Sequence, residues 1–319
     1  MTVTLDNGNI LGVNMEVCSI CKEEEPIYYQ RHSGLKFCRE CFIKYIKKKV
    51  RKTLGKKIIK QNVKIGMGLS GGKDSLVMAY LLREYYDPIP NSEIIGLIVD
   101  EGIEGFRKRG IKIAVEFCKK YDIPYYIDTF EDHIGYTLDR IVERAKEKNI
   151  TANPCTFCGI IRRRILNSMA LERSCNYLAI GHNLDDVAQA VMMNYIEGDI
   201  KKLVILGKSI EHPKFVRRIK PLKYIPEIEV KLFADLVGIK YHSEPCPYSS
   251  LSYRNEISEI LNLLEKKHPG KKYSIVAGFE RLVKYLPLEK DKSICKYCGN
   301  PSASGICKVC EILRRLDII

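Results

Sequence analysis

The sequence has no long uninterrupted run of apolar residues. None of its stretches approaches the roughly 20 apolar residues that a membrane-spanning helix requires. The segment Met1–Asn14 also lacks the charged start and the long apolar core of a secretory signal peptide. We therefore expect a cytoplasmic protein without a membrane partner.

Acidic residues are in the minority, because 39 Asp and Glu stand against 53 Lys and Arg, which gives a net charge of +14. The segment Phe42–Lys73 contains no acidic residue at all. Its first part, Phe42–Lys60, is predicted to be one helix with a basic face and an apolar side. The basic face indicates contact with an RNA backbone, and a solvated helix face is the alternative. The apolar side consists of Phe42, Ile46, Val50, Leu54 and Ile58.

A Walker A phosphate loop is absent, because Met67 and Asp74 stand where that pattern requires a glycine and a hydroxyl residue. Instead, Ser70-Gly71-Gly72-Lys73-Asp74-Ser75 joins a short apolar strand, Val63–Leu69, to a predicted helix. Two glycines permit a tight turn that directs N–H groups and the positive end of a helix dipole at one point. The loop is predicted to bind phosphate, and an ordinary turn capped by a serine is the alternative.

The 13 cysteines are expected to bind metal rather than to form disulfides, because thiols stay reduced in the cytoplasm. Eight of them form two C-x2-C…C-x2-C sets, whose spacing is typical of a closed tetrahedral zinc site. Each set predicts a structural zinc ribbon, and a small iron site is the alternative. The first set is Cys18, Cys21, Cys38 and Cys41, and the second is Cys295, Cys298, Cys307 and Cys310.

Strand and helix patterns alternate through the middle of the chain. This alternation predicts an α/β fold with a doubly wound, Rossmann-like parallel sheet, flanked by the two zinc ribbons. After Val63–Leu69, we predict strands at Ile94–Val99, Pro124–Asp128, Tyr177–Ile180 and Phe215–Ile219, and helices near 103–121, 131–149, 158–174 and 184–197. The predicted domains are a leader at 1–14, a ribbon with the basic helix at 15–61, the α/β domain at 62–288 and a ribbon at 289–319.

Ligands of such sheets bind at the carboxyl ends of the strands, where the phosphate loop also lies. One polar segment at a strand end is Gly181-His182-Asn183-Leu184-Asp185-Asp186. Its paired carboxylates, Asp185 and Asp186, are predicted to hold Mg²⁺ on bound phosphates. The alternative is that Asn183 or Asp185 only caps the next helix. For His182 two interpretations stay open: it contacts the nucleotide, or it is a buried structural histidine. Further segments at this edge are Asp100–Gly102 and Asn153–Gly159.

A third C-x2-C pair lies in Asn153-Pro154-Cys155-Thr156-Phe157-Cys158-Gly159. Proline disfavours helical geometry at the residue before it, so Cys155 is expected near a helix start, where a thiolate is favoured. Two cysteines cannot complete a tetrahedral metal site. Cys246, which lies between two prolines, is the best candidate for a third ligand. The remaining cysteines, Cys118 and Cys175, are expected to be core residues.

In their order and number, these motifs resemble the tRNA 2-thiolation enzymes of the TtuA/NcsA group, which have the PP-loop of ATP pyrophosphatases. The resemblance runs from Cys18 to Cys310. It implies that ATP on Ser70–Ser75, with Asp74 in a catalytic role, adenylates O2 of a tRNA uridine, and that sulfur then displaces AMP. It also implies a 4Fe-4S cluster with one iron open to sulfide, held by catalytic Cys155, Cys158 and Cys246.

One position separates the branches of this group. Enzymes that act on the T-loop uridine carry lysine four residues after the second cluster cysteine, where this chain has Arg162. Arginine there is similar to the NcsA and eukaryotic cytosolic thiouridylase branch, which modifies the wobble uridine. It keeps the charge and can bind phosphate with two N–H groups. The resemblance favours the wobble uridine, with the T-loop uridine as the alternative.

The resemblance implies ATP, Mg²⁺, the cluster and two Zn²⁺ as cofactors. Its partners are tRNA and a sulfur donor, either a thiocarboxylated ubiquitin-like protein or inorganic sulfide. A homodimer is one option for the assembly. Three other interpretations stay open: a persulfide on Cys158 or Cys246 with a disulfide and no cluster, a PP-loop ligase such as a lysidine synthase, and a non-catalytic RNA-binding adaptor. The intact Ser70, Asp74 and Ser75 argue against the adaptor.

Overall fold

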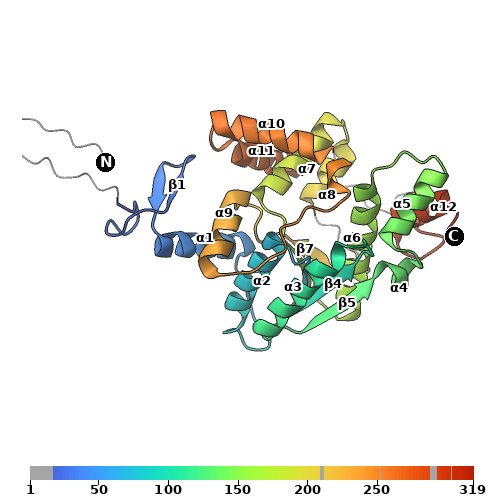
Figure 1. Ribbon diagram of the computed structural model, residues 1–319, viewed down its shortest axis with the longest axis horizontal. Helices are drawn as coiled ribbons and strands as arrows, with labels where there is room; N and C mark the ends of the chain where they lie inside the picture. The colour runs from blue at the N-terminus through green and yellow to red at the C-terminus, as the bar shows by residue number, and fades with distance from the viewer. Residues whose placement is uncertain (1–16, 209–211, 252, 288–292, 303) are drawn as a thin grey trace, which may run out of the picture. The chain divides into compact units, whose positions relative to one another are not determined.

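The computed structural model describes residues 17–208, 212–251, 253–287, 293–302 and 304–319 (Figure 1). The leader predicted at 1–14 lies outside these ranges. The chain divides into two compact units, Met1–Lys48 and Lys49–Ile319. The finer domain boundaries expected at 61 and 288 stay a prediction. None of the helices in the described ranges has the length and apolar character needed to cross a membrane.

The first unit carries a short antiparallel hairpin of β1 (Tyr28–Gln30) and β2 (Leu35–Phe37). The hairpin lies between the two C-x2-C pairs of the first cysteine set. Helix α1 (Arg39–Leu54) follows directly and continues into the second unit. Its buried residues recur every four positions, as predicted for its apolar side: Phe42, Ile46, Val50 and Leu54.

The prediction that this helix continues to Lys60 was wrong. Gly55 adopts a left-handed conformation, with φ +69°, and its N–H donates to the carbonyl of Arg51 at 3.0 Å. Glycine adopts this conformation at little cost, so the helix ends here with its last carbonyls paired. Ile58 therefore lies outside the helix, as do three lysines of the predicted basic face: Lys56, Lys57 and Lys60.

The second unit is built on a sheet of five parallel strands in the order β5-β4-β3-β6-β7. The chain proceeds from the central strand outwards on one side and then returns to fill the other side. The two halves meet between β3 and β6, which makes the carboxyl ends of these strands the switch point where ligands bind. The predicted doubly wound sheet is confirmed. Its strands are β3 (Lys64–Gly68), β4 (Glu93–Asp100), β5 (Tyr125–Thr129), β6 (Tyr177–Ile180) and β7 (Arg217–Ile219).

Helices connect these strands much as predicted, with one exception. The helix expected at 131–149 is two helices, because Gly135 at φ +75° ends the first and the side chain of Thr137 caps the second. The helices of this unit before the second ribbon are α2 (Lys73–Tyr86), α3 (Arg107–Lys120), α4 (Phe130–Ile134), α5 (Leu138–Glu147), α6 (Pro154–Glu172), α7 (Leu184–Ile196), α8 (Ile200–Gly207), α9 (Glu227–Val237), α10 (Arg254–Lys267) and α11 (Lys271–Tyr285).

Helix α6 is held in a hydrophobic core between the sheet and the second ribbon. It buries Ile161, Ile165 and Met169 in the same cluster as Leu97 of β4. The ribbon consists of β8 (Ser293–Ile294), β9 (Pro301–Ser302) and α12 (Lys308–Arg315), and α12 lies beside α5 and α6 in Figure 1. It adds Val309, Ile312, Leu313 and Leu316 to that cluster, whereas the last residue, Ile319, is exposed.

Candidate functional site

The phosphate loop follows β3 and is fixed by bonds within its own sequence. The hydroxyl of Ser75 accepts from the N–H of Ser70 at 3.2 Å and donates to the carbonyl of Gly72 at 2.8 Å. Gly71 has φ +85°, and a Cβ there would lie 2.1 Å from the carbonyl oxygen of Gly110 in α3. Only glycine therefore fits at position 71, for reasons of both conformation and space.

Gly72, not a serine, is the N-cap residue of α2, and it makes no side-chain capping bond. The N–H groups of the first turn and the helix dipole therefore point at the space above the loop, as an anion site requires. The loop is also held from outside. The N–H of His242 donates to the carbonyl of Gly71 at 2.8 Å, and Arg107 donates to that of Ser70 at 2.7 Å.

The segment after β6 meets this loop directly. A Cβ on Gly181 would lie 2.9 Å from the backbone of Asp74, so the two chains are in close contact. The amide of Asn183 donates to Oδ1 of Asp74 at 2.8 Å. Asn183 also caps α7, because its side chain accepts from the N–H of Asp186 at 3.0 Å. The expected capping role and a contact with the phosphate loop thus coexist in one residue.

The two carboxylates of this segment point in different directions. Asp185 is buried, forms an ion pair with Lys272 of α11, and accepts from the N–H of Glu227 at 2.8 Å. Asp186 lies 3.4 Å from Arg254. Burial raises the pKa of Asp186 to about 6; Arg254 opposes this rise and the nearby charge of Asp74 adds to it. The structure thus brings Asp186 near Asp74 and directs Asp185 into the packing of three helices.

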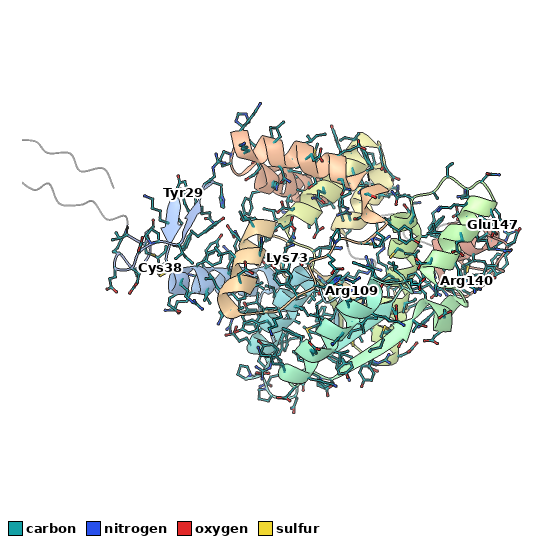
Figure 2. All side chains as sticks on the ribbon, viewed as in Figure 1. Tyr29, Cys38, Lys73, Arg109, Arg140 and Glu147 are labelled. Atoms are coloured by element: carbon teal, nitrogen blue, oxygen red, sulfur yellow. The ribbon has the colours of Figure 1, made fainter. Side chains whose placement is uncertain are left out.

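Lys73 stands at the start of α2 (Figure 2), between two carboxylates. Its ammonium lies 3.1 Å from Asp74 and 2.6 Å from Glu227 at the start of α9. Burial disfavours the charged form, but the two carboxylates raise the pKa of Lys73 above its ordinary value. Lys73 is therefore a fixed positive charge beside the phosphate loop.

The three central cysteines come from two segments. Asn153 caps α6 by accepting from the N–H of Cys155 at 2.8 Å, so Cys155 lies in the first turn, as predicted. Its Sγ lies 3.6 Å from the carbonyl of Tyr248, in the loop that carries Cys246. Cys158 and Cys246 both pack against the core that holds α6. The structure thus gathers the three thiols at the amino end of α6.

A thiolate was expected at Cys155, but the environment favours the thiol. Burial raises the pKa of Cys155, and the neighbouring Cys246 adds to the rise. Burial also raises the pKa of Cys158 to about 12, although Arg162 opposes it. Desolvation outweighs the helix dipole here. A bound metal would supply the positive charge that these buried sulfurs need.

Positive side chains crowd the same edge of the sheet. Burial, together with the nearby charges of Lys220 and Arg254, lowers the pKa of His182 to about 3. Burial likewise lowers the pKa of Lys220 to about 8 and of Arg163 to about 10, with Arg218 contributing to both. Cations that destabilise one another in this way favour a bound anion. Sequence analysis missed this group, although Arg218 and Lys220 lie at the end of β7.

Each four-cysteine set is arranged for a single ion, because its four sulfurs all lie within 4.8 Å of one another. In both sets the second C-x2-C pair stands at a helix start, α1 for the first and α12 for the second. Arg164 of α6 donates to Cys298 at 3.2 Å and to Cys307 at 3.3 Å.

Among the described residues, the sulfurs of Cys155, Cys158 and Cys246 form no group this compact. A four-iron cluster is larger than one ion and requires wider spacing.

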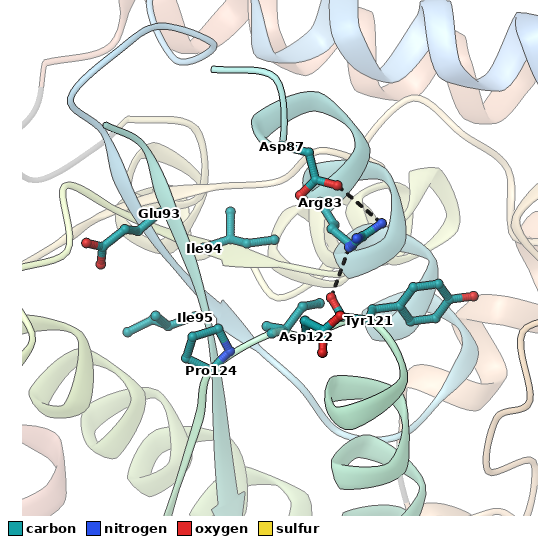
Figure 3. Close-up of a pocket in the computed structure, with 9 residues that line it drawn as sticks. Arg83, Asp87, Glu93, Ile94, Ile95, Tyr121, Asp122 and Pro124 are labelled. Carbon is teal, nitrogen blue, oxygen red and sulfur yellow. Dashed lines mark hydrogen bonds and ion pairs between the residues drawn. The ribbon is translucent and has the colours of Figure 1, made fainter. Parts of the chain in front are cut away.

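A shallow cavity of about 270 Å³ lies at the opposite edge of the sheet (Figure 3). It is lined by the first residues of β4 and by the turn before β5, including Glu93, Asp122 and Pro124. Arg83 bridges it, donating to the carbonyl of Tyr121 at 2.9 Å. This cavity contains none of the motif residues and is not the candidate site.

Comparisons with known proteins agree with this geometry. A family model for the PP-loop domain matches residues 43–264, and one for the N-terminal LIM domain of 2-thiouridine synthetase TtuA matches residues 17–43. The solved structure of the U34-tRNA thiolase NcsA from Methanococcus maripaludis with its 4Fe-4S cluster is similar at 57% identity and a TM-score of 0.86. The match covers 95% of this chain and 97% of that one.

Two curated relatives are similar over nearly the whole chain. A probable sulfurtransferase of Methanocaldococcus jannaschii is 51% identical over 96% of this chain and 90% of its own length. The tRNA 2-thiolation protein NcsA of Haloferax volcanii is 34% identical over 95% of this chain and 99% of its own length.

Proposed function

The chain belongs to the TtuA/NcsA family of PP-loop tRNA 2-thiolation enzymes, and on this premise we propose that it replaces O2 of the wobble uridine of tRNA with sulfur. It is a tRNA sulfurtransferase, so the adaptor interpretation is set aside. One observation carries the proposal: the phosphate loop and the three central cysteines lie at one edge of the sheet, joined by Arg107, Glu101 and Arg162. The likeness to a U34-tRNA thiolase supports the choice of uridine.

The phosphate loop would bind the phosphates of ATP, with Ser70–Ser75 and the first turn of α2 as donors. Asp74 and Asp186 would hold Mg²⁺, since they lie near each other beside the phosphate loop, whereas Asp185 is buried in an ion pair with Lys272 and points away from the loop. The uridine O2 attacks the α-phosphorus, pyrophosphate leaves, and the adenylated base then exchanges AMP for sulfur. The cations Arg163, Arg218, Lys220 and Arg254 would stabilise the negative charge that the phosphates and the tRNA bring to this edge.

Cys155, Cys158 and Cys246 fit the 4Fe-4S cluster that the solved relative carries. Three thiolates leave one iron without a protein ligand, so the bound cluster would supply a position for exogenous sulfide. The chain's own part is to orient and shield the sulfurs. Asn153 fixes the first turn of α6, and the core packing of Cys158 and Cys246 limits access of water. The sulfur donor would be a thiocarboxylated ubiquitin-like protein or inorganic sulfide.

The two compact cysteine sets would hold zinc. A four-thiolate site carries excess negative charge, and donors to its sulfurs stabilise it. Arg164 supplies such a donor to the second set from α6, two residues after Arg162. The second zinc site would thereby help to fix the helix on which Cys155 and Cys158 lie.

The wobble assignment is tested with tRNA transcripts. The purified protein, ATP, Mg²⁺ and sulfide should form 2-thiouridine in a wild-type transcript, measured by mass spectrometry of nucleosides. A transcript with cytidine at the wobble position should give none, whereas a transcript with cytidine at the T-loop target should react normally. The reverse pattern would assign the T-loop uridine instead.

The exposed lysines of α1 should contribute to tRNA binding. Lys44, Lys48 and Lys52 recur every four residues and are all exposed, so they form one stripe. Lys49, by contrast, donates to the hydroxyl of Tyr273 at 2.7 Å and is not part of it. Each phosphate contact contributes about 0.7 to 0.9 to the slope of log affinity against log salt. Replacing the three lysines by alanine should therefore weaken tRNA binding and reduce that slope by about 2 to 3.

The matched control removes three exposed lysines from α3: Lys112, Lys119 and Lys120. Both triple variants change the net charge equally, so only a local contact can separate them. Equal slopes for the two variants would show that the α1 stripe is simply a solvated face.

A further inference from the structure

A buried carboxylate at the end of β4 stands between the phosphate loop and the cysteine-bearing helix. The side chain of Glu101 is 4% exposed. Its Oε2 lies 2.5 Å from Nε of Arg107, and its Oε1 lies 3.2 Å from Nη1 of Arg162. Its backbone is also fixed, because its carbonyl accepts from the N–H of Leu138 at 2.7 Å. Glu101 is thus one negative charge shared by two guanidinium groups.

Arg107 continues this chain of contacts to the phosphate loop. Its Nη1 donates to the carbonyl of Ser70 at 2.7 Å, while Nε and Nη2 donate to the carbonyl of Val99 at 2.9 and 2.7 Å. The side chain of Arg107 is 7% exposed. A buried guanidinium with three such bonds has essentially one orientation, and that orientation sets the position of the Ser70 carbonyl.

Arg162 extends the chain of contacts from Glu101 in the other direction, toward the central cysteines. It lies four residues after Cys158 on α6, so the two side chains share one face of the helix. Its side chain is 46% exposed, which leaves it free to rotate into solvent unless something holds it. Its positive charge acts on the thiols of Cys158 and Cys155. Glu101 is the carboxylate that the structure shows within ion-pair distance of Arg162.

We propose that Glu101 is a positioning residue that locks the phosphate loop and the cysteine helix into one catalytic geometry, acting through Arg107 and Arg162. The proposal rests on the proposed function, since it concerns the alignment of a bound nucleotide with the sulfur site. Removing the carboxylate leaves two cations without their shared partner: Arg162 is released toward solvent, and the uncompensated buried charge of Arg107 weakens its hold on the Ser70 carbonyl. The Ser70 carbonyl and the charge beside Cys158 then lose their fixed places together.

The experiment compares Glu101→Gln, which removes the charge at constant size, with Glu104→Gln, an exposed glutamate three residues away in the same loop. We expect E101Q to lose about 100-fold in kcat/KM for thiolation, since a displacement of about 1 Å in a positioning group costs that much. It should also weaken equilibrium ATP binding by about tenfold, because Arg107, which holds the Ser70 carbonyl, loses its buried ion-pair partner. E104Q should match the wild type in both measurements, and Glu101→Asp should recover part of the loss.

A double-mutant cycle separates positioning from general destabilisation. If Glu101 acts through Arg162, the variant E101Q/R162Q should be no worse in kcat/KM than the worse single variant. Additive penalties, or ATP binding by E101Q equal to that of E104Q, would overturn the proposal. If E101Q melts too low to be assayed, the cycle is run with E101D, and the same outcomes decide.

Equilibrium ATP binding is measured without tRNA. This measurement therefore tests the link through Arg107 even if the wobble assignment fails, and a failed wobble assay leaves the ATP result intact.

The visible absorption of anaerobically purified E101Q gives a third readout. We expect an altered spectrum relative to E104Q at equal iron content, because Arg162 no longer holds its place beside the sulfurs. Identical spectra would mean that Glu101 does not act on the cysteine site.

Discussion

Replacing Asp74 by alanine should abolish thiolation while the protein stays folded. Asp74 accepts from Asn183 at 2.8 Å and pairs with Lys73 at 3.1 Å, so it links the phosphate loop to the start of α7. Its side chain is only partly buried, at 26% exposed, so its loss should cost little stability. As one of the two carboxylates proposed to hold Mg²⁺, it should matter greatly for catalysis. We expect kcat to fall by about 1,000-fold, the upper range for removing one electrostatic stabiliser.

The matched control for this change is Asp87→Ala at the other end of α2. Asp87 pairs with Arg83 at 3.2 Å and is 51% exposed, so this surface ion pair contributes little to the stability of the fold. Ser75→Ala should resemble Asp74→Ala, because the loop loses the hydroxyl that bonds Ser70 and Gly72. The measurements are 2-thiouridine formed per enzyme and the melting temperature. Wild-type thiolation by Asp74→Ala would show that this loop does not bind the reacting ATP.

The position of the site could be predicted because its parts are local. A parallel strand followed by glycines and polar residues places those residues at the carboxyl edge, whatever the details of packing. The strand ends at Gly68, Asp100 and Ile180 accordingly meet there. The start of α6 could be predicted equally well, since Pro154 and the capping Asn153 are adjacent in sequence.

The direction of individual side chains could not be predicted in the same way. Asp185 and Asp186 are neighbours on a helix and point about 100° apart, because a turn has about 3.6 residues. Sequence cannot say which of them faces Asp74, since Lys272 and Glu227, which hold Asp185, come from distant segments. The cations Lys220 and Arg254 were missed for the same reason. They belong to no motif, and only the fold brings them to His182.

Replacing any one of Cys155, Cys158 and Cys246 by serine should remove iron and thiolation together. The three residues come from α6 and the 246–249 loop, and three thiolates are one fewer than the usual four ligands of a cubane cluster. Losing one more thiolate would leave two, and two thiolates cannot hold the cluster. We expect anaerobically purified variants to be colourless and to have about 1,000-fold lower thiolation, comparable with losing a catalytic group. Iron analysis and 2-thiouridine formation measure the two effects separately.

The controls are Cys118→Ser and Cys175→Ser. Both thiols are buried, and each packs against a glycine within a strand of the sheet. A Cβ on Gly96 would lie 3.2 Å from the sulfur of Cys118, and a Cβ on Gly66 would lie 3.2 Å from the sulfur of Cys175. Serine there should lower the melting temperature modestly and leave iron and activity unchanged. All five variants should keep the metal content of the two four-cysteine sets, because the eight ribbon cysteines are untouched.

A persulfide mechanism predicts a different pattern. It requires a thiolate nucleophile at Cys158 or Cys246 and gives no role to Cys155. Burial raises the pKa of Cys158 to about 12, so without a metal this thiol would be almost fully protonated at neutral pH and a poor nucleophile. Burial therefore disfavours a persulfide on Cys158, and the serine variants decide for Cys246. If Cys246→Ser kept its full iron content and Cys155→Ser kept full thiolation, the cluster assignment would be wrong, and sulfur would have to travel on a cysteine of this chain.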